Sequence, residues 1–179
     1  IVTSTFADKI CAHHGVHLAE CLTGFKWIAA VMADFEKSGS HNYVFGFEES
    51  YGYLAGSYVR DKDAVVASML ICEMAAYYRA NGSSIKQRLE EIYSQYGRYF
   101  NKTDSFEFPG LSGMDKMAGI MTQLRQEPPA AIGAHKITKA VDFKKSEETG
   151  LPPANVLLYE LENGAPVITR PSGTEPTIK

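Results

Sequence analysis

The sequence predicts an α/β domain with a parallel sheet in a three-layer arrangement, followed by a smaller α+β domain. In the first half of the chain, short β-prone runs alternate with segments of helical spacing, a pattern typical of right-handed crossovers. All eight prolines lie at Pro109 or later, and the second half combines a helix with hairpin-spaced strands. We therefore expect an α/β domain at residues 1–97 and a truncated α+β domain at residues 98–179.

Three β-prone runs and two helical segments open the first domain. Thr5 and Asp8 form a capping-box pattern, and Gly15 is suited to end the helix that they begin. A second helix, carrying apolar residues at helical spacing, is expected to end at Gly39. The β-prone runs cover residues 1–4, 16–22 and 43–47.

Two further helices are expected before the domain boundary. The first follows Lys62 and is apolar on more than one face, so we expect it to be well buried. The second begins with a capping box formed by Ser84 and Gln87 and stops at Gly97. The apolar positions of the helix that follows Lys62 are Val65, Val66, Met69, Leu70, Met74, Tyr77 and Tyr78.

The second domain should contain one helix and several strands. Residues 99–108 are a candidate strand, Ser112 can cap a helix, and Pro128 follows its expected end. Asn163-Gly164 is a hairpin turn signal. The remaining strand candidates are residues 136–143, 156–161 and 166–169.

Composition and charge exclude several functional classes. The 179 residues carry a net charge of −3, so no overall basic field is available to bind nucleic acid or an acidic membrane surface. No apolar run reaches the ~20 residues of a membrane span. Three cysteines without CxxC spacing favour a reduced, cytoplasmic protein. Because the chain opens at Ile1 within an apolar run and ends at Lys179 within a loop motif, we expect it to be a fragment of a longer protein.

The clearest chemical signal is the loop at residues 170–179. Arg170 can bind phosphate oxygens in a bidentate manner, and the hydroxyls and loop amides can add donors. The alternative is an ordinary polar turn rich in small residues. The candidate phosphate ligands are Arg170, Ser172, Gly173, Thr174 and Lys179.

A second signal lies at residues 46–53, where the third strand ends. Ligands of open parallel sheets bind outside the carboxyl ends of the strands. Glu48 and Ser50, two apart in extended backbone, should point the same way and suit sugar hydroxyls. Glu48 and Glu49 diverge in extended chain, which makes them a poor glycosidase pair. A solvated acidic loop is the alternative.

Two further segments are expected near this acidic loop. Thr23, Gly24 and Lys26 follow the second strand and should lie at the same sheet edge, although Lys26 is also compatible with an exposed first-turn lysine. Lys62 lies in a run of alternating charge that can deliver a cation or proton, or can simply cap the following helix. His13, His14 and His17 lack the spacing of a metal site, and no metal ligands are expected in this chain.

Taken together, these motifs resemble those of the α-D-phosphohexomutases, the phosphoglucomutase/phosphomannomutase type. The resemblance covers the chain and corresponds to the third domain and the first part of the fourth. The motifs are Thr-Gly-Phe-Lys at 23–26, Phe-Glu-Glu-Ser-Tyr-Gly at 47–52, Arg-Asp-Lys-Asp at 60–63 and Arg-Pro-Ser-Gly-Thr-Glu-Pro at 170–176.

The resemblance implies interconversion of hexose 1-phosphate and hexose 6-phosphate through a bisphosphate. It implies that Glu48 and Ser50 bind sugar hydroxyls, that Thr23 and Gly24 set sugar orientation, and that Lys62 is a general acid/base candidate. It implies that the 170–174 loop holds the phosphate that is not transferred. Domain closure in the whole enzyme would unite these groups.

The family's phosphoserine loop and its Asp-rich Mg²⁺ loop are absent from this sequence. The resemblance therefore implies that Mg²⁺, a hexose 1,6-bisphosphate and the missing N-terminal domains of the same chain belong to the full enzyme, and that the isolated fragment binds no cofactor and is inactive. Two alternatives remain: a non-catalytic sugar-phosphate binding module, and a structural domain whose loops are solvated turns. The sequence does not decide between glucose and mannose.

Overall fold

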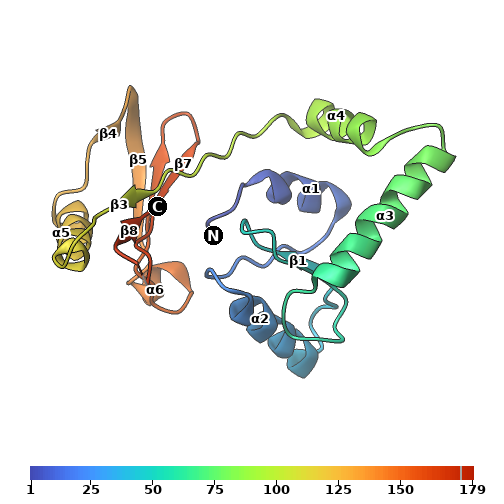
Figure 1. Ribbon diagram of the computed structural model, residues 1–179, viewed down its shortest axis with the longest axis horizontal. Helices are drawn as coiled ribbons and strands as arrows, with labels where there is room; N and C mark the ends of the chain where they lie inside the picture. The colour runs from blue at the N-terminus through green and yellow to red at the C-terminus, as the bar shows by residue number, and fades with distance from the viewer. Residues whose placement is uncertain (174) are drawn as a thin grey trace. The chain divides into compact units, whose positions relative to one another are not determined.

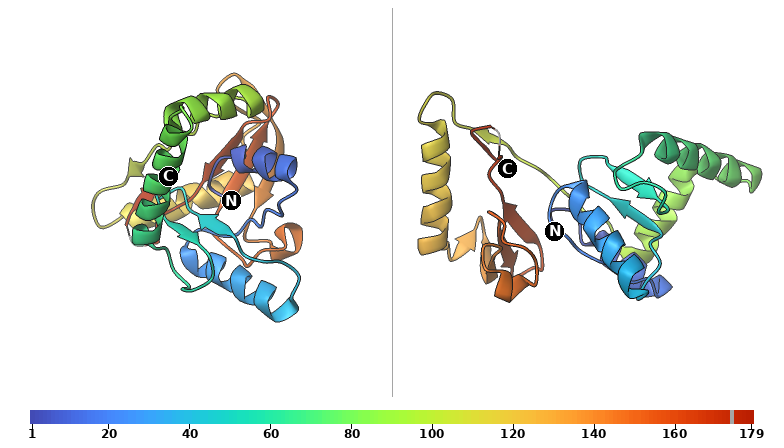
Figure 2. Two further views of the ribbon diagram at one scale, coloured as in Figure 1. Left: turned by 90° about the vertical axis from the view of Figure 1, so that its right-hand side faces the viewer. Right: turned by 90° about the horizontal axis from the view of Figure 1, so that it is seen from below.

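The computed structural model describes residues 1–173 and 175–179 and divides them into two compact units. The first unit runs from Ile1 to Asn101 and the second from Lys102 to Lys179. Each unit has its own hydrophobic core, so each is described by itself. Figure 1 shows the elements of both units, and Figure 2 shows them from two further directions.

The first unit contains four helices and one hairpin within its described residues. The hairpin β1–β2 is antiparallel and pairs Gly46 with Leu54. Helices α1 and α2 lie on opposite sides of this hairpin (Figure 1). In chain order the elements are α1 (Phe6–His14), α2 (Phe25–Ser38), β1 (Phe45–Phe47), β2 (Tyr53–Ala55), α3 (Ala64–Ala80) and α4 (Ile85–Tyr96).

Local capping explains where these helices begin and end. Gly15 and Gly39 adopt left-handed backbone and end α1 and α2, as expected from the sequence. The Ser84 hydroxyl accepts the Gln87 N–H (3.2 Å) at the start of α4, which confirms the second capping box. The first capping box is wrong: Thr5 makes no side-chain cap bond, and the Ser4 hydroxyl instead accepts the Phe6 N–H (3.1 Å).

The α/β class is confirmed, but the parallel ladder expected within it does not form. Residues 1–4, with a bend at Thr3, and residues 16–22 belong to no strand. The Ile1 amino group donates to the Cys21 carbonyl (3.1 Å), which joins the two segments. All strand pairs among the described residues are antiparallel. A strand requires a repeating series of backbone hydrogen bonds, whereas the local β-propensity of these runs specifies only their extended backbone.

Helix α3 is also more exposed than its composition predicts. None of its residues is buried, and Val65 is 80% exposed. A helix that is apolar on several faces needs a partner for each face. Within its unit α3 packs mainly against β2 and α4, which cover one side.

The core of the first unit lies between α2 and the hairpin. Phe25 and Met32 of α2 pack against the fully buried Leu54 of β2, with Ile28 and Tyr43 at the edge. The Tyr43 hydroxyl donates to the Leu54 carbonyl (3.0 Å). Burial of each large apolar side chain contributes about 1.5–3 kcal/mol, and this cluster fixes α2 against β2, the second strand of the hairpin whose connection carries Glu48.

The second unit packs one long helix against a four-stranded antiparallel sheet of order β4-β5-β6-β7. The helix and three of these strands confirm the sequence prediction, and Gly164 makes the expected turn with φ +79°. The expected strand at residues 99–108 shrinks to the two residues of β3, which pair with β8. The elements are β3 (Phe106–Glu107), α5 (Gly113–Gln126), β4 (Ala131–Ile132), β5 (His135–Asp142), α6 (Ser146–Thr149), β6 (Leu157–Leu161), β7 (Pro166–Thr169) and β8 (Thr177–Ile178).

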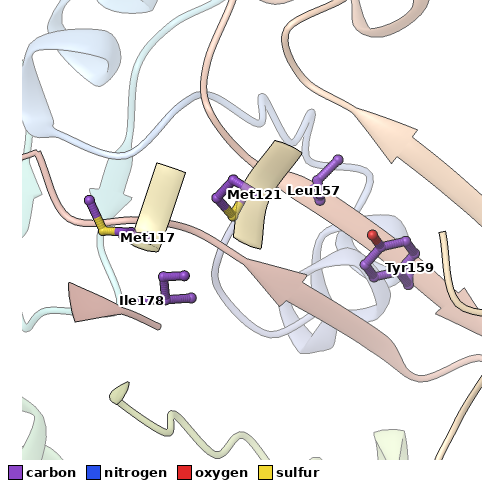
Figure 3. Packing of buried hydrophobic residues seen from close by; sticks show 5 residues of the cluster. All are labelled: Met117, Met121, Leu157, Tyr159 and Ile178. Carbon is purple, nitrogen blue, oxygen red and sulfur yellow. The ribbon is translucent and has the colours of Figure 1, made fainter. Parts of the chain in front are cut away.

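Methionines of α5 fill the core of the second unit. Met117 and Met121 pack against Leu157 and Tyr159 of β6 and against Ile178 of β8 (Figure 3). The Tyr159 hydroxyl donates to the Leu124 carbonyl (3.2 Å), so its polar end is satisfied. Since Ile178 belongs to this core, the end of the 170–179 loop is anchored to the unit.

Candidate functional site

Glu48 lies directly after β1, in the connection that leads to β2. Its N–H donates to the Gly52 carbonyl (2.9 Å), which closes the connection into a tight loop. Its side chain is only 8% exposed. A carboxylate this well covered requires polar partners, because burial of an unpaired charge is costly.

Two partners reach the Glu48 carboxylate from separate segments. The Gly24 N–H at the start of α2 donates to Oε1 (3.1 Å), and the Lys62 ammonium lies 3.6 Å from Oε2. The start of a helix carries a partial positive charge, so both partners complement the carboxylate. The expectation that the Thr23-Gly24 loop lies near Glu48 is confirmed geometrically, and Lys62 joins them.

Thr23 adds a polar atom with no assigned partner. Its Oγ1 is buried, and no hydrogen bond to it is found among the described residues. Such atoms are uncommon in native interiors and often mark a position where water or ligand completes the bonding. Thr23, Gly24 and Glu48 also line a cavity of about 280 Å³, whose other lining residues come mainly from α1, α2, β1 and the segments at residues 1–4 and 16–22.

The cavity is largely apolar apart from these groups. Burial, opposed by the charged N-terminus, raises the pKa of the Cys21 thiol, which also lines the cavity. Burial likewise raises the pKa of Tyr43 to about 12. Both groups are therefore neutral near neutral pH, and Glu48 is one of four carboxylates that line the cavity, with Asp8, Glu20 and Glu49.

Lys62 is placed by a helix cap. Asp63 accepts the N–H groups of Val65 (2.8 Å) and Val66 (3.1 Å) at the start of α3, and its own N–H donates to the Tyr53 carbonyl (2.8 Å). The bond that the Tyr58 hydroxyl donates to Asp63 (2.5 Å), together with the two backbone bonds, lowers the pKa of this carboxyl. The capping and functional interpretations of this run are thus compatible, since the cap holds Lys62 beside β2.

Two predicted sugar ligands lie outside this cluster. Residues 49 and 50 form a turn rather than extended chain, so Ser50 is exposed whereas Glu48 is covered. The prediction that they point the same way rested on strand alternation, which does not hold in a turn. Lys26 places its ammonium 5.2 Å from the centre of the Trp27 ring, which is the exposed first-turn arrangement.

In the second unit the 170–179 segment forms a hairpin. Arg170 and Lys179 exchange both backbone hydrogen bonds (2.9 Å each), so their side chains lie on the same face. Two like charges in directly opposed positions repel one another. No ion pair to either is found among the described residues, so a bound anion would relieve this repulsion.

Ser172 and Gly173 are the other predicted phosphate ligands that the structure describes. The Ser172 N–H donates to the Thr177 carbonyl (2.7 Å), and the Ser172 hydroxyl accepts the Glu175 N–H (3.3 Å). Gly173 is exposed, with no atom within 4 Å of the position that a Cβ would occupy. Thr174 lies outside the described residues.

The histidines do not form a metal site. His13 meets His14 edge to face, whereas His17 stacks on His41 with ring centres 4.2 Å apart. Within the residues that the structure describes, no three His, Cys, Asp or Glu side chains gather as metal donors would. The residues present therefore do not fit Mg²⁺, and no chemical step is assigned to a metal here.

No helix in the described part of the chain is long and apolar enough to cross a membrane.

Comparison with known proteins places these features in one family. Residues 1–96 match the model of phosphoglucomutase/phosphomannomutase, alpha/beta/alpha domain III. The chain is therefore a member of the phosphoglucomutase/phosphomannomutase family, and the resemblance inferred from its motifs is confirmed.

Individual relatives agree with this assignment. A phosphoglucomutase of Staphylococcus epidermidis is 38% identical, and one of Staphylococcus aureus is 36% identical, each over an alignment of 189 positions that covers the whole chain. The chain spans 34% of the length of each of these relatives. The crystal structure of the open form of Paramecium parafusin, a phosphoglucomutase, superimposes with a TM-score of 0.64 at 22% identity, covering 98% of this chain and 30% of that one.

Proposed function

We propose that this chain supplies the sugar-recognition and phosphate-recognition groups of an enzyme that interconverts hexose 1-phosphate and hexose 6-phosphate. The observation that carries the proposal is that the Gly24 N–H and the Lys62 ammonium, from segments far apart in sequence, both reach the covered carboxylate of Glu48. The named relatives are phosphoglucomutases, so the proposed substrate class is a phosphorylated glucose or a close hexose analogue.

Glu48 suits a sugar hydroxyl because an ionised carboxylate accepts strong hydrogen bonds. The Gly24 N–H holds Oε1 in place, which leaves Oε2 with the ammonium of the more exposed Lys62 as its neighbour. An incoming hydroxyl can donate to Oε2 while Lys62 shifts toward solvent. Thr23, with its unpartnered hydroxyl, would orient the same ring, and Ser50 would add a contact from the exposed turn.

Lys62 is the proposed acid/base residue. Its side chain is 55% exposed, and its ammonium lies next to the carboxylate that would hold the sugar, so it would offer a proton donor beside the substrate hydroxyls. Mutase chemistry in the full-length enzyme would also need the phosphoserine, Mg²⁺ and hexose bisphosphate of the remaining domains. These components are proposed for the whole protein, and this chain would not turn over sugar phosphates by itself.

Arg170, Ser172, Gly173, Thr174 and Lys179 are the proposed phosphate ligands of the second unit. The paired cations on one hairpin face match the charge of a phosphate group, and an exposed glycine backbone allows close approach. A phosphate bound here would relieve the repulsion between the Arg170 and Lys179 side chains.

The test uses the full-length protein and this chain in parallel. The full-length protein should convert glucose 1-phosphate to glucose 6-phosphate in the presence of Mg²⁺ and glucose 1,6-bisphosphate, and mannose 1-phosphate should be assayed beside it. Calorimetric titration of this chain with the same sugar phosphates reports binding without turnover. Binding by the chain together with an inactive full-length protein would favour a non-catalytic sugar-phosphate module. Absence of both would contradict the proposal.

A further inference from the structure

Gly52 lies in the loop between β1 and β2, close to the side chains of Glu48 and Lys62. A Cβ built at this position would lie 2.8 Å from Glu48 Oε2 and 2.9 Å from Lys62 Cδ, both inside normal contact distance. Gly52 is buried, and its carbonyl accepts the Glu48 N–H (2.9 Å). Glu48 and Lys62, the two members of the ion pair, therefore occupy the space that a side chain at position 52 would need.

Backbone conformation does not account for this glycine. Ten glycines of the chain have positive φ, and Gly52 is not among them. The positive φ of the loop falls instead on its neighbour Tyr51, at +64°. Since other residues can adopt the backbone of Gly52, the feature that requires glycine here is the close approach of Glu48 and Lys62.

We infer that Gly52 is a positioning residue for the sugar site, a role that rests on the proposed function. Its missing side chain lets the Lys62 stem pass close to the Glu48 carboxylate, so that the ammonium and Oε2 lie within 3.6 Å. The three atoms nearest to the added Cβ, namely Glu48 Oε2, Lys62 Cδ and Lys62 Cβ, all belong to side chains rather than backbone. An added methyl group would therefore displace the functional groups and leave the fold in place.

The first test is an amide spectrum of the 179-residue chain carrying Gly52→Ala. The Gly24 N–H is held by Glu48, so its ¹H–¹⁵N resonance should shift toward the random-coil position when the carboxylate moves. Gly119→Ala is the matched control, because its Cβ would meet no atom within 4 Å and it lies in the second unit. An unchanged Gly24 resonance in the Gly52 variant would overturn the inference, whatever the protein's activity.

The second test is activity of the full-length protein. Gly52→Ala should lower kcat/KM for glucose 1-phosphate by about 10- to 100-fold, the effect of losing a hydrogen bond to a charged group, whereas Gly119→Ala should leave it unchanged. In a Lys62→Ala background the contact at Cδ is gone, so Gly52→Ala should cost at least about threefold less than in the wild type. Equal losses in both backgrounds would contradict the role.

The two tests separate this inference from the function on which it rests. A full-length wild-type protein without mutase activity, together with a displaced Gly24 resonance in the Gly52 variant, would refute the proposed function and support the positioning role. Mutase activity that survives Gly52→Ala at the wild-type level would refute the positioning role and support the function.

Discussion

Replacement of Glu48 tests the candidate site most directly, because two different substitutions remove different contacts. Glu48→Gln keeps an oxygen for the Gly24 N–H and removes the charge that faces Lys62. Glu48→Ala removes both contacts and leaves a partly buried N–H without an acceptor. The difference between the two variants therefore reports the value of the Gly24 bond.

The structure sets the expected size of each effect. The pair with Lys62 is worth about 0.2–1 kcal/mol, since that ammonium is more than half exposed and screened by solvent. An unsatisfied Gly24 N–H costs about 1–3 kcal/mol. Glu48→Gln should therefore lower the free energy of unfolding of the first unit by no more than about 1 kcal/mol, and Glu48→Ala by about 1–4 kcal/mol.

Trp27 provides the assay, since it is the single tryptophan of the chain and lies in α2, three residues from Gly24. Urea unfolding followed by its fluorescence reports the first unit. Glu49→Gln and Glu49→Ala are the matched controls, and both should be near neutral. Equal destabilisation by the two Glu48 variants would refute the assigned Gly24 contact. For activity, Glu48→Gln should lower kcat/KM of the full-length protein about 5- to 30-fold, as a neutral acceptor replaces a charged one.

Two further predictions concern the helix cap and the phosphate hairpin. Asp63→Ala should lower the thermal midpoint at pH 7. Because the folded-state pKa of Asp63 is lowered, the stability that its carboxylate contributes is present above the ordinary carboxyl pKa and is lost as the pH falls through the folded-state pKa. The thermal midpoints of variant and wild type should therefore converge below about pH 4, and a constant gap between them would contradict the cap. Arg170→Ala should lower full-length mutase activity by roughly two orders of magnitude, while the hairpin, freed from repulsion by Lys179, should be no less stable without phosphate. An unchanged rate would show that this loop has another role.

Local patterns predicted the five longer helices and the turn between β6 and β7, but not the short α6 or the β1–β2 hairpin. Gly39 and Gly97 end helices because the chain must leave the helical path there, and Ser84 caps α4 through its own hydroxyl. These outcomes depend on neighbours within a few residues. The parallel ladder and the burial of α3 depend on partners distant in sequence, and β-propensity or apolar composition does not specify those partners.

The proximity of the Thr23-Gly24 loop to Glu48 was predicted correctly, but from a parallel sheet that does not form among the described residues. The contact that joins the two loops is the hydrogen bond from the Gly24 N–H to the Glu48 carboxylate, which the sequence does not specify. Ser50 failed because a turn replaced the assumed extended chain. The role of Gly52 had no sequence signal beyond the glycine itself, since an ordinary turn glycine looks the same.

The two partners of Glu48 differ in how firmly they are held, and this difference suits the sugar site that we propose. One oxygen is held by a backbone N–H at the start of a helix, a fixed donor that costs little entropy to orient. The other faces Lys62, a flexible and mostly exposed side chain whose attraction at 3.6 Å is weak enough for a hydroxyl to displace. The rigid contact sets the position of the carboxylate, and in the proposed site the weak contact would offset its charge until a sugar hydroxyl displaced Lys62. If Lys62 were held as firmly as the Gly24 N–H, a sugar hydroxyl would have to break a strong ion pair in order to bind. Glu48→Gln would remove the charge that attracts the mobile partner Lys62, whereas Gly52→Ala would displace the carboxylate from its fixed partner, the Gly24 N–H.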